Sequence, residues 1–72
     1  MMDAKQWGAH LKALRKDAEM TQVELANAAY LHKNAMTGYE TGRVEPGRSV
    51  LVCLAKALGV DMNTLHGEEE EK

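Results

Sequence analysis

Residues 20–42 read MTQVELANAAYLHKNAMTGYETG, and this stretch decides the fold. Thr21 and Glu24 form a Thr-x-x-Glu capping box, which predicts that a helix begins there. Ala26 lies ten positions before Met36, and a short connector separates the two segments that carry them. Two short helices that cross at a steep angle need a side chain no larger than Ala at the contact, and an apolar side chain from the second helix to fix the angle. The stretch therefore predicts a helix-turn-helix.

The second helix of this pair has a predicted inner side and a predicted end. The first helix can run only two turns before Tyr30–Leu31, and the second begins near His32. Its apolar positions are spaced for one buried face: Leu31, Ala35, Met36 and Tyr39. Gly42 is expected to end the helix, because glycine readily adopts the left-handed conformation that closes one.

Further helices are predicted on both sides. Asp3 is a candidate N-cap for a helix over residues 4–18, and this helix carries an apolar stripe at Ala4, Trp7, Leu11, Leu14 and Ala18. After a loop over residues 43–47, Ser49 is the expected cap of a fourth helix that stops at Gly59, and Asp61 caps a last short turn. Apolar residues of the fourth helix recur at helical spacing, at Leu51, Leu54, Ala55 and Leu58. The predicted fold class is all-α, a compact bundle of five short helices.

Composition limits the kind of protein. A chain of 72 residues forms one small domain, which buries only about 60% of the surface of its unfolded form. The lone cysteine, Cys53, excludes a disulfide framework and fits a reducing compartment, so a cytoplasmic protein with no membrane span is expected. No nucleophile–base pair, phosphate loop or metal-ligand cluster is visible in the sequence, so we expect no enzyme activity, no cofactor and no metal site.

Charge is distributed unevenly along the chain. The formal net charge is −2, but residues 68–72 (EEEEK) hold four Glu and one Lys, so residues 1–67 carry +1. We interpret 1–67 as the domain and 68–72 as an acidic, disordered tail. Any nucleic-acid binding must then come from individually placed cations in a nearly neutral body.

The motifs together resemble a known family, the lambda-repressor/Cro-like (Xre-type) DNA-binding domains. The resemblance runs from about Trp7 to His66 and rests on LKALRK (11–16), MTQVELA (20–26), Met36 with YETG (39–42), Pro46 and LAKALGVDMNTL (54–65). It implies a lambda-repressor-like bundle in which the second and third helices form the helix-turn-helix and the third reads the major groove of double-stranded DNA.

The resemblance also implies roles for individual residues. Gln22 matches a phosphate contact that supports the recognition helix, and Lys33, Asn34, Thr37 and Gly38 match the outward positions that read base edges. His32 and Arg43 flank that helix near the DNA backbone, although His32 could instead be a helix cap. Arg15 and Glu40 match a structural ion pair.

The chemistry of these side chains fits such roles. Lys donates to guanine O6 or N7, and Asn can form a bidentate pair with adenine. Thr37 offers a hydroxyl that donates and accepts, and a methyl that can touch the thymine methyl. Solvated surface side chains are the alternative at Lys33 and Asn34.

Two positions depart from the family pattern. Tyr30 stands where the turn usually carries Gly, and a left-handed Tyr costs about 1–2 kcal/mol. Either the turn is strained there, or the helix before it ends differently and its angle to the next helix shifts. Arg48 stands where the family often buries an aliphatic residue, which leaves the start of the fourth helix open.

The leading hypothesis is a sequence-specific transcriptional regulator, a repressor that binds a two-fold DNA operator as a homodimer. The expected dimer surface is the loop Val44–Gly47 with parts of the fourth and fifth helices. The alternative is a protein-interaction module with the same fold, such as an antitoxin or anti-repressor, which the near-neutral body and the acidic tail favour.

Overall fold

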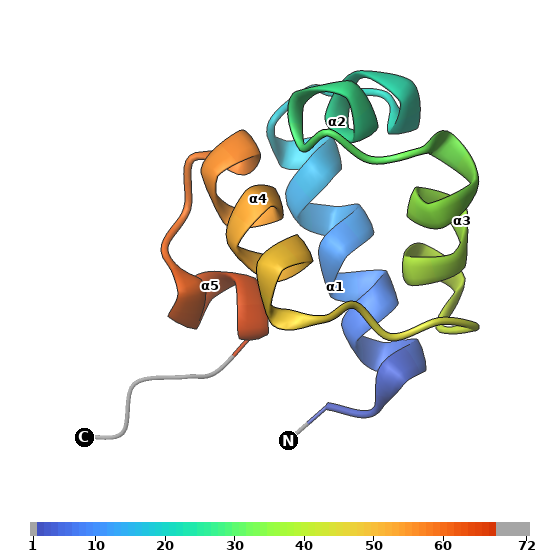
Figure 1. Cartoon of the computed structure of the whole chain (residues 1–72). Coiled ribbons are helices and arrows are strands. Elements are labelled where there is room, and N and C mark those ends of the chain that lie inside the picture. The colour runs from blue at the N-terminus through green and yellow to red at the C-terminus, as the bar shows by residue number, and fades with distance from the viewer. Residues whose placement is uncertain (1, 68–72) are drawn as a thin grey trace.

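The computed structural model describes residues 2–67, and over that range it contains five helices and no strand. The helices are α1 (Ala4–Asp17), α2 (Gln22–Ala28), α3 (Lys33–Thr41), α4 (Arg48–Leu58) and α5 (Met62–His66). In Figure 1, α2 lies across the end of α1, while α3 and α5 stand at opposite edges of the molecule. The predicted all-α bundle of five helices is confirmed. The predicted acidic tail lies outside the described residues.

Side-chain caps begin three of the helices where the sequence predicted them. The carboxylate of Asp3 accepts from the Gln6 N–H at 2.8 Å, and the hydroxyl of Thr21 accepts from the Glu24 N–H at 3.1 Å. At α5, Asp61 accepts from the Thr64 N–H at 2.8 Å. Each cap satisfies a backbone donor that has no partner inside its helix, and so sets where that helix starts.

The start of α4 differs from the prediction. Gly47 occupies the N-cap position, and its carbonyl accepts from the Leu51 N–H at 3.0 Å. The expectation that Ser49 caps this helix is therefore wrong, because the first turn closes around Gly47 and Ser49 already lies inside it. Arg48 is the first helical residue and is exposed.

Left-handed residues end the helices. Gly42 ends α3 with a φ of 80° and Gly59 ends α4 with a φ of 73°, as predicted. Glu19 after α1 and Tyr30 after α2 also have positive φ, 59° and 60°. After each of these two residues, the next N–H bonds to a carbonyl five residues back, the closing pattern of a Schellman motif; the Leu31 N–H, for example, donates to the Ala26 carbonyl at 2.7 Å.

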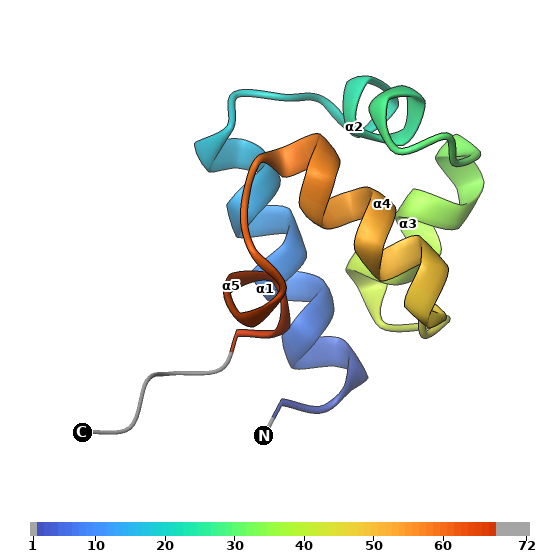
Figure 2. The same cartoon turned by 60° about the vertical axis from the view of Figure 1, so that its left-hand side comes forward.

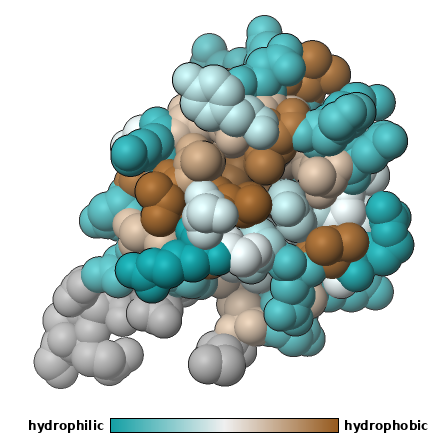
Figure 3. Space-filling view, viewed as in Figure 1, coloured by the Kyte–Doolittle hydropathy of each residue, from teal (hydrophilic) through white to brown (hydrophobic). Residues whose placement is uncertain are grey.

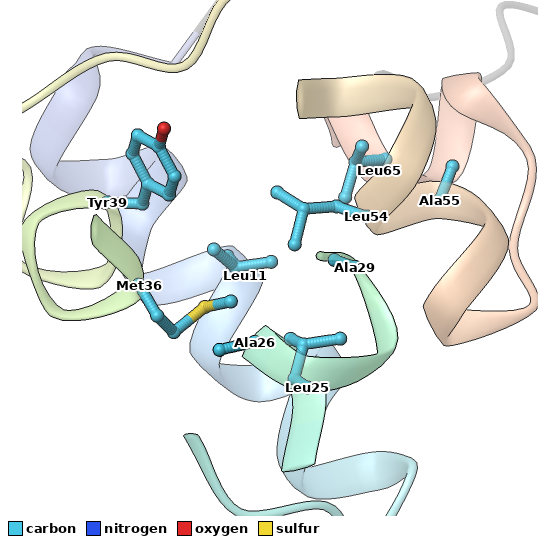
Figure 4. Packing of buried hydrophobic residues seen from close by; sticks show 9 residues of the cluster. All are labelled: Leu11, Leu25, Ala26, Ala29, Met36, Tyr39, Leu54, Ala55 and Leu65. Carbon is cyan, nitrogen blue, oxygen red and sulfur yellow. The ribbon is translucent and has the colours of Figure 1, made fainter. Parts of the chain in front are cut away.

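The core lies where α1, α2, α3, α4 and α5 converge (Figure 4). Its buried apolar side chains come from all five helices: Leu11, Leu25, Ala26, Ala29, Met36, Tyr39, Leu54, Ala55 and Leu65. Ala18 does not belong to it. The prediction placed Ala18 on the α1 stripe, but α1 ends at Asp17 and the exposed Ala18 only caps it.

The packing of α1 against α3 depends on a glycine inside α1. A Cβ built on Gly8 would lie 2.5 Å from the carbonyl oxygens of Tyr39 and Glu40. Real Cβ atoms do not approach backbone so closely, so only glycine allows this crossing distance. A Cβ on Gly42 would similarly lie 2.6 Å from the Cα of Lys5. Two glycines thus bring α3 directly onto the backbone of α1.

Polar side chains of α1 attach the last helix, which lies against α1 in Figure 2. The indole Nε1 of Trp7 donates to the Leu65 carbonyl at 2.8 Å, and His10 Nε2 bonds the Thr64 carbonyl at 2.7 Å. Because a carbonyl only accepts, His10 must carry its proton on Nε2. None of the helices in residues 2–67 is long and apolar enough to cross a membrane.

Candidate nucleic-acid interface

The angle between α2 and α3 is set by the pair that the sequence singled out. Ala26 is 1% exposed and Met36 is fully buried, and Figure 4 shows the two side chains close together below Leu11. The small Ala26 side chain lets the helices approach, and the Met36 side chain fills the angle between them. The predicted helix-turn-helix is formed by α2 and α3.

The N-terminal turn of α3 presents polar side chains to solvent. His32, Lys33 and Asn34 are all exposed, whereas Met36 and Tyr39 on the same helix are buried. His32 occupies the N-cap position but makes no side-chain cap hydrogen bond. The imidazole is therefore not used in closing the helix, and the amide, ammonium and imidazole groups together face outward at one end of α3.

The side of α3 farther along its length is covered. Gly38 is buried, and a Cβ placed on it would lie 3.2 Å from Val44 Cγ2 and 3.5 Å from a guanidinium nitrogen of Arg43. The expectation that Gly38 occupies an outward position is corrected: the loop after α3 folds back over it. Arg43 is exposed and lies beside α3, as a flanking position requires.

A polar network joins α1, α2 and α3 below this surface. Arg15 Nε donates to Glu40 Oε2 at 2.6 Å, a second guanidinium nitrogen donates to Glu40 Oε1 at 3.1 Å, and a third contact reaches the Met20 carbonyl at 2.9 Å. The side chains of Arg15 and Glu40 are only 9% and 3% exposed. The hydrogen bond to Glu40 is the main reason that the pKa of Arg15 is raised above its usual value. The predicted ion pair is present, and it is buried.

Gln22 connects this ion pair to α3. Its Nε2 donates to Glu40 Oε1 at 3.0 Å, and its Oε1 accepts from the Thr37 hydroxyl at 3.3 Å. The half-buried Gln22 side chain is thus held at both ends of its amide. Sequence reasoning anticipated Gln22 and Thr37 as separate contacts and did not anticipate that they bond each other.

Gly8 is the residue that sequence reasoning missed. It is buried in α1, but the orientation of α3 depends on it, because the Tyr39 and Glu40 backbone lies where its side chain would be. The available signal was a glycine inside an otherwise regular helical pattern, which often marks a close backbone approach. Cys53 is a half-buried free thiol, and residues 2–67 contain no cluster of His, Cys, Asp and Glu arranged to hold a metal ion.

Comparison with known proteins identifies relatives of this architecture. A family model described as a helix-turn-helix domain matches residues 6–66. The chain is 39% identical over 62 residues to the immunity repressor protein of Bacillus phage phi105, covering 86% of this chain and 43% of that protein. It is 32% identical over 65 residues to the ImmF control region 10 kDa protein of the same phage, covering 90% of this chain and 72% of that protein. The chain thus spans less than half the length of the immunity repressor.

A solved structure resembles the whole fold. The restriction-modification controller protein C.AhdI from Aeromonas hydrophila superposes with a TM-score of 0.84 at 26% sequence identity. The match covers 86% of this chain and 94% of that protein. The likeness therefore extends beyond α2 and α3 to the arrangement of the bundle around them.

Proposed function

This chain belongs to the helix-turn-helix domain family, and from that premise we propose that it is a transcriptional regulator, a repressor, that binds a specific sequence of double-stranded DNA. The observation that carries the proposal is the exposed N-terminal turn of α3, where His32, Lys33 and Asn34 project from a helix whose opposite side is buried. An α-helix presented in this way fits the width of the major groove. The similarity to a phage immunity repressor supports repression as the outcome.

In this proposal, the position of each residue determines which part of the DNA it contacts. Lys33, Asn34 and Thr37 meet base edges, while Gln22, His32 and Arg43 hold phosphates beside them. Gly38 contributes no side chain to the groove and lets the loop that carries Arg43 lie close to α3. Arg15 and Glu40 support the surface from below.

The experiment is selection from random DNA duplexes followed by titration of the selected site at increasing salt. If phosphate contacts contribute to binding, log Kd should rise linearly with the logarithm of the salt concentration. The selected site should also be bound more tightly than random DNA. Replacing both Lys33 and Asn34 by Ala should weaken specific binding by at least about tenfold, because each base contact contributes on the order of 1–3 kcal/mol. Lys12→Ala, which removes an exposed charge from α1, is the matched control. Selection of no sequence would count against the proposal.

We also propose that two copies bind DNA together, at half-sites about 10 bp apart. The dimer surface proposed here is the loop Val44–Gly47 with parts of α4 and α5. Val44 is 47% exposed, and in Figure 3 hydrophobic side chains appear over the middle of the face on which α4 lies. Sedimentation equilibrium tests this, with Val44→Asp expected to weaken the dimer; a monomer bound singly to DNA would contradict it.

A protein-interaction module is the second candidate, and the exposed Tyr30 ring favours it, since 90% of that residue is accessible. The variant with Lys33 and Asn34 replaced by Ala distinguishes the two functions. It should lose DNA binding if the first proposal holds, whereas capture of a protein partner through another surface would be unaffected.

A further inference from the structure

Hydrogen bonding in the network below α3 can run in one direction only. An Arg side chain has donors alone and a carboxylate has acceptors alone, so Arg15 donates to Glu40. The atom of the Gln22 amide that faces Glu40 must therefore be the nitrogen, which leaves Gln22 Oε1 facing Thr37. An amide oxygen only accepts. The Thr37 hydroxyl consequently donates its single proton inward, to Gln22 Oε1 and to the Lys33 carbonyl, both at 3.3 Å.

This direction decides what Thr37 can offer to DNA. Guanine O6 and N7 and thymine O4 need a donor, but the hydroxyl proton of Thr37 is already committed within the protein. The hydroxyl and the methyl diverge from a tetrahedral Cβ, so the methyl is directed away from Gln22 while the hydroxyl faces it. The hydroxyl oxygen could still accept from adenine N6 or cytosine N4, but it lies at Gln22 and the Lys33 carbonyl. Because Thr37 is partly exposed, its methyl is the group left to meet a base.

Building on the proposed function, we infer that Thr37 selects thymine at the base pair it meets, by packing its methyl against the thymine C5-methyl. Thymine is the base that presents an apolar group in the major groove. Contact between two methyl groups removes apolar surface from water without requiring a hydrogen bond. Glu40 and Gln22 act here as positioning residues, because they determine which part of Thr37 is turned toward the DNA.

The test changes the DNA before it changes the protein. Each thymine of the selected operator is replaced in turn by uracil, which lacks only the C5-methyl and keeps the same hydrogen-bonding groups. One thymine in each half-site should bind about fourfold more weakly as uracil, the effect expected for one buried carbon group. Folding cannot confuse this result, because the protein is unaltered. A bound site with no uracil-sensitive thymine would overturn the inference.

Variants then assign the sensitive thymine to Thr37. Thr37→Ser keeps the hydroxyl and removes the methyl, so the preference for thymine over uracil should disappear. Thr37→Val keeps a methyl in place, so the preference should persist even if overall affinity changes. Thr41→Ser is the matched control on the same helix and should leave the preference unchanged. If Thr37→Ser still prefers thymine over uracil, the inference is overturned but the proposed function stands. If the protein selects no DNA sequence, both the proposed function and the inference are overturned.

Discussion

Tyr30 ends α2 in a left-handed conformation, and 90% of it is exposed. The sequence left two possibilities, a strained left-handed Tyr30 or a helix that ends differently, and the φ of 60° shows the first. The backbone hydrogen bonds of the turn are nevertheless complete, since the Tyr30 N–H donates to the Asn27 carbonyl at 3.2 Å and the next N–H to that of Ala26. The turn therefore closes with its hydrogen bonds intact, and what remains is the steric cost of a Cβ in the left-handed region.

Tyr30→Gly should raise the free energy of unfolding by about 1 kcal/mol, because glycine adopts this conformation without the clash. Tyr30→Ala removes the same ring but keeps the Cβ, so it should give no such gain. Urea denaturation followed by helical circular dichroism measures both. Equal stabilities of the Gly and Ala variants would show that the backbone carries no strain at this residue.

At the scale of the helices, the contact between α1 and α3 depends on backbone proximity. Gly8→Ala should destabilise the domain by about 3 kcal/mol or prevent folding, since its Cβ would have to displace two carbonyl groups. Gly47→Ala is the control, because nothing lies within 4 Å of a Cβ at that position. It should change stability by no more than about 1 kcal/mol, the usual effect of an N-cap substitution. Similar losses for the two variants in chemical denaturation would contradict the close crossing.

The attachment of α5 should depend on pH through Asp61. Hydrogen bonds from the backbone and the side chain of Thr64 hold the pKa of Asp61 below its usual value of 3.8. A carboxyl group with a lowered folded pKa stabilises the folded state above its unfolded pKa, and this contribution is lost as pH falls through the folded pKa. Fluorescence of Trp7, whose indole bonds the Leu65 carbonyl on α5, should report the change below pH 3.8.

Asp61→Asn supplies the control for this effect. An Asn side chain can still cap the helix but does not titrate in this range, so its Trp7 signal should lose the component assigned to Asp61. An acid response of the same size in both proteins would assign the effect to another carboxyl group.

At the scale of the whole molecule, the formal net charge of −2 disfavours binding to the negatively charged DNA backbone. Residues 68–72 contribute a formal charge of −3, while residues 1–67 carry +1. A chain that ends at residue 67 should therefore bind DNA more tightly, by severalfold at low salt, with the difference shrinking as salt screens it. A second variant, in which the four glutamates at 68–71 are replaced by Gln, keeps the chain length. It should also bind DNA more tightly at low salt. Equal affinity of the shortened and full chains at low salt would show that this charge does not act on the interface.

Predictions from the sequence were confirmed where the physical cause acts within a few residues. The N-caps at Asp3, Thr21 and Asp61 and the end of α3 at Gly42 depend on hydrogen bonds or dihedral angles over one turn. The prediction that Ser49 caps α4 was wrong because local sequence alone does not decide that position. Both Gly47 and Ser49 are acceptable caps, and the choice between them is made by how the preceding loop arrives. The family match also confirms the predicted fold, whereas the roles of individual residues toward DNA remain predictions.

By itself, the sequence determined the number and order of the helices, the pairing of Ala26 with Met36 and the exposed start of α3, because helical spacing and capping are written into neighbouring positions. Only the tertiary structure decided that Gly38 is covered, that α1 and α3 meet at Gly8 and that Gln22 turns the hydroxyl of Thr37 inward. Two of these features join residues far apart in the chain: Gly8 meets the backbone of Tyr39 and Glu40, and Gln22 bonds Thr37 across 15 positions. The cover over Gly38 comes from Arg43 and Val44, only five and six positions away, but it depends on how the loop after α3 folds back. Helical spacing and capping do not encode such contacts, since they exist only once the helices have packed and the loop has taken its path.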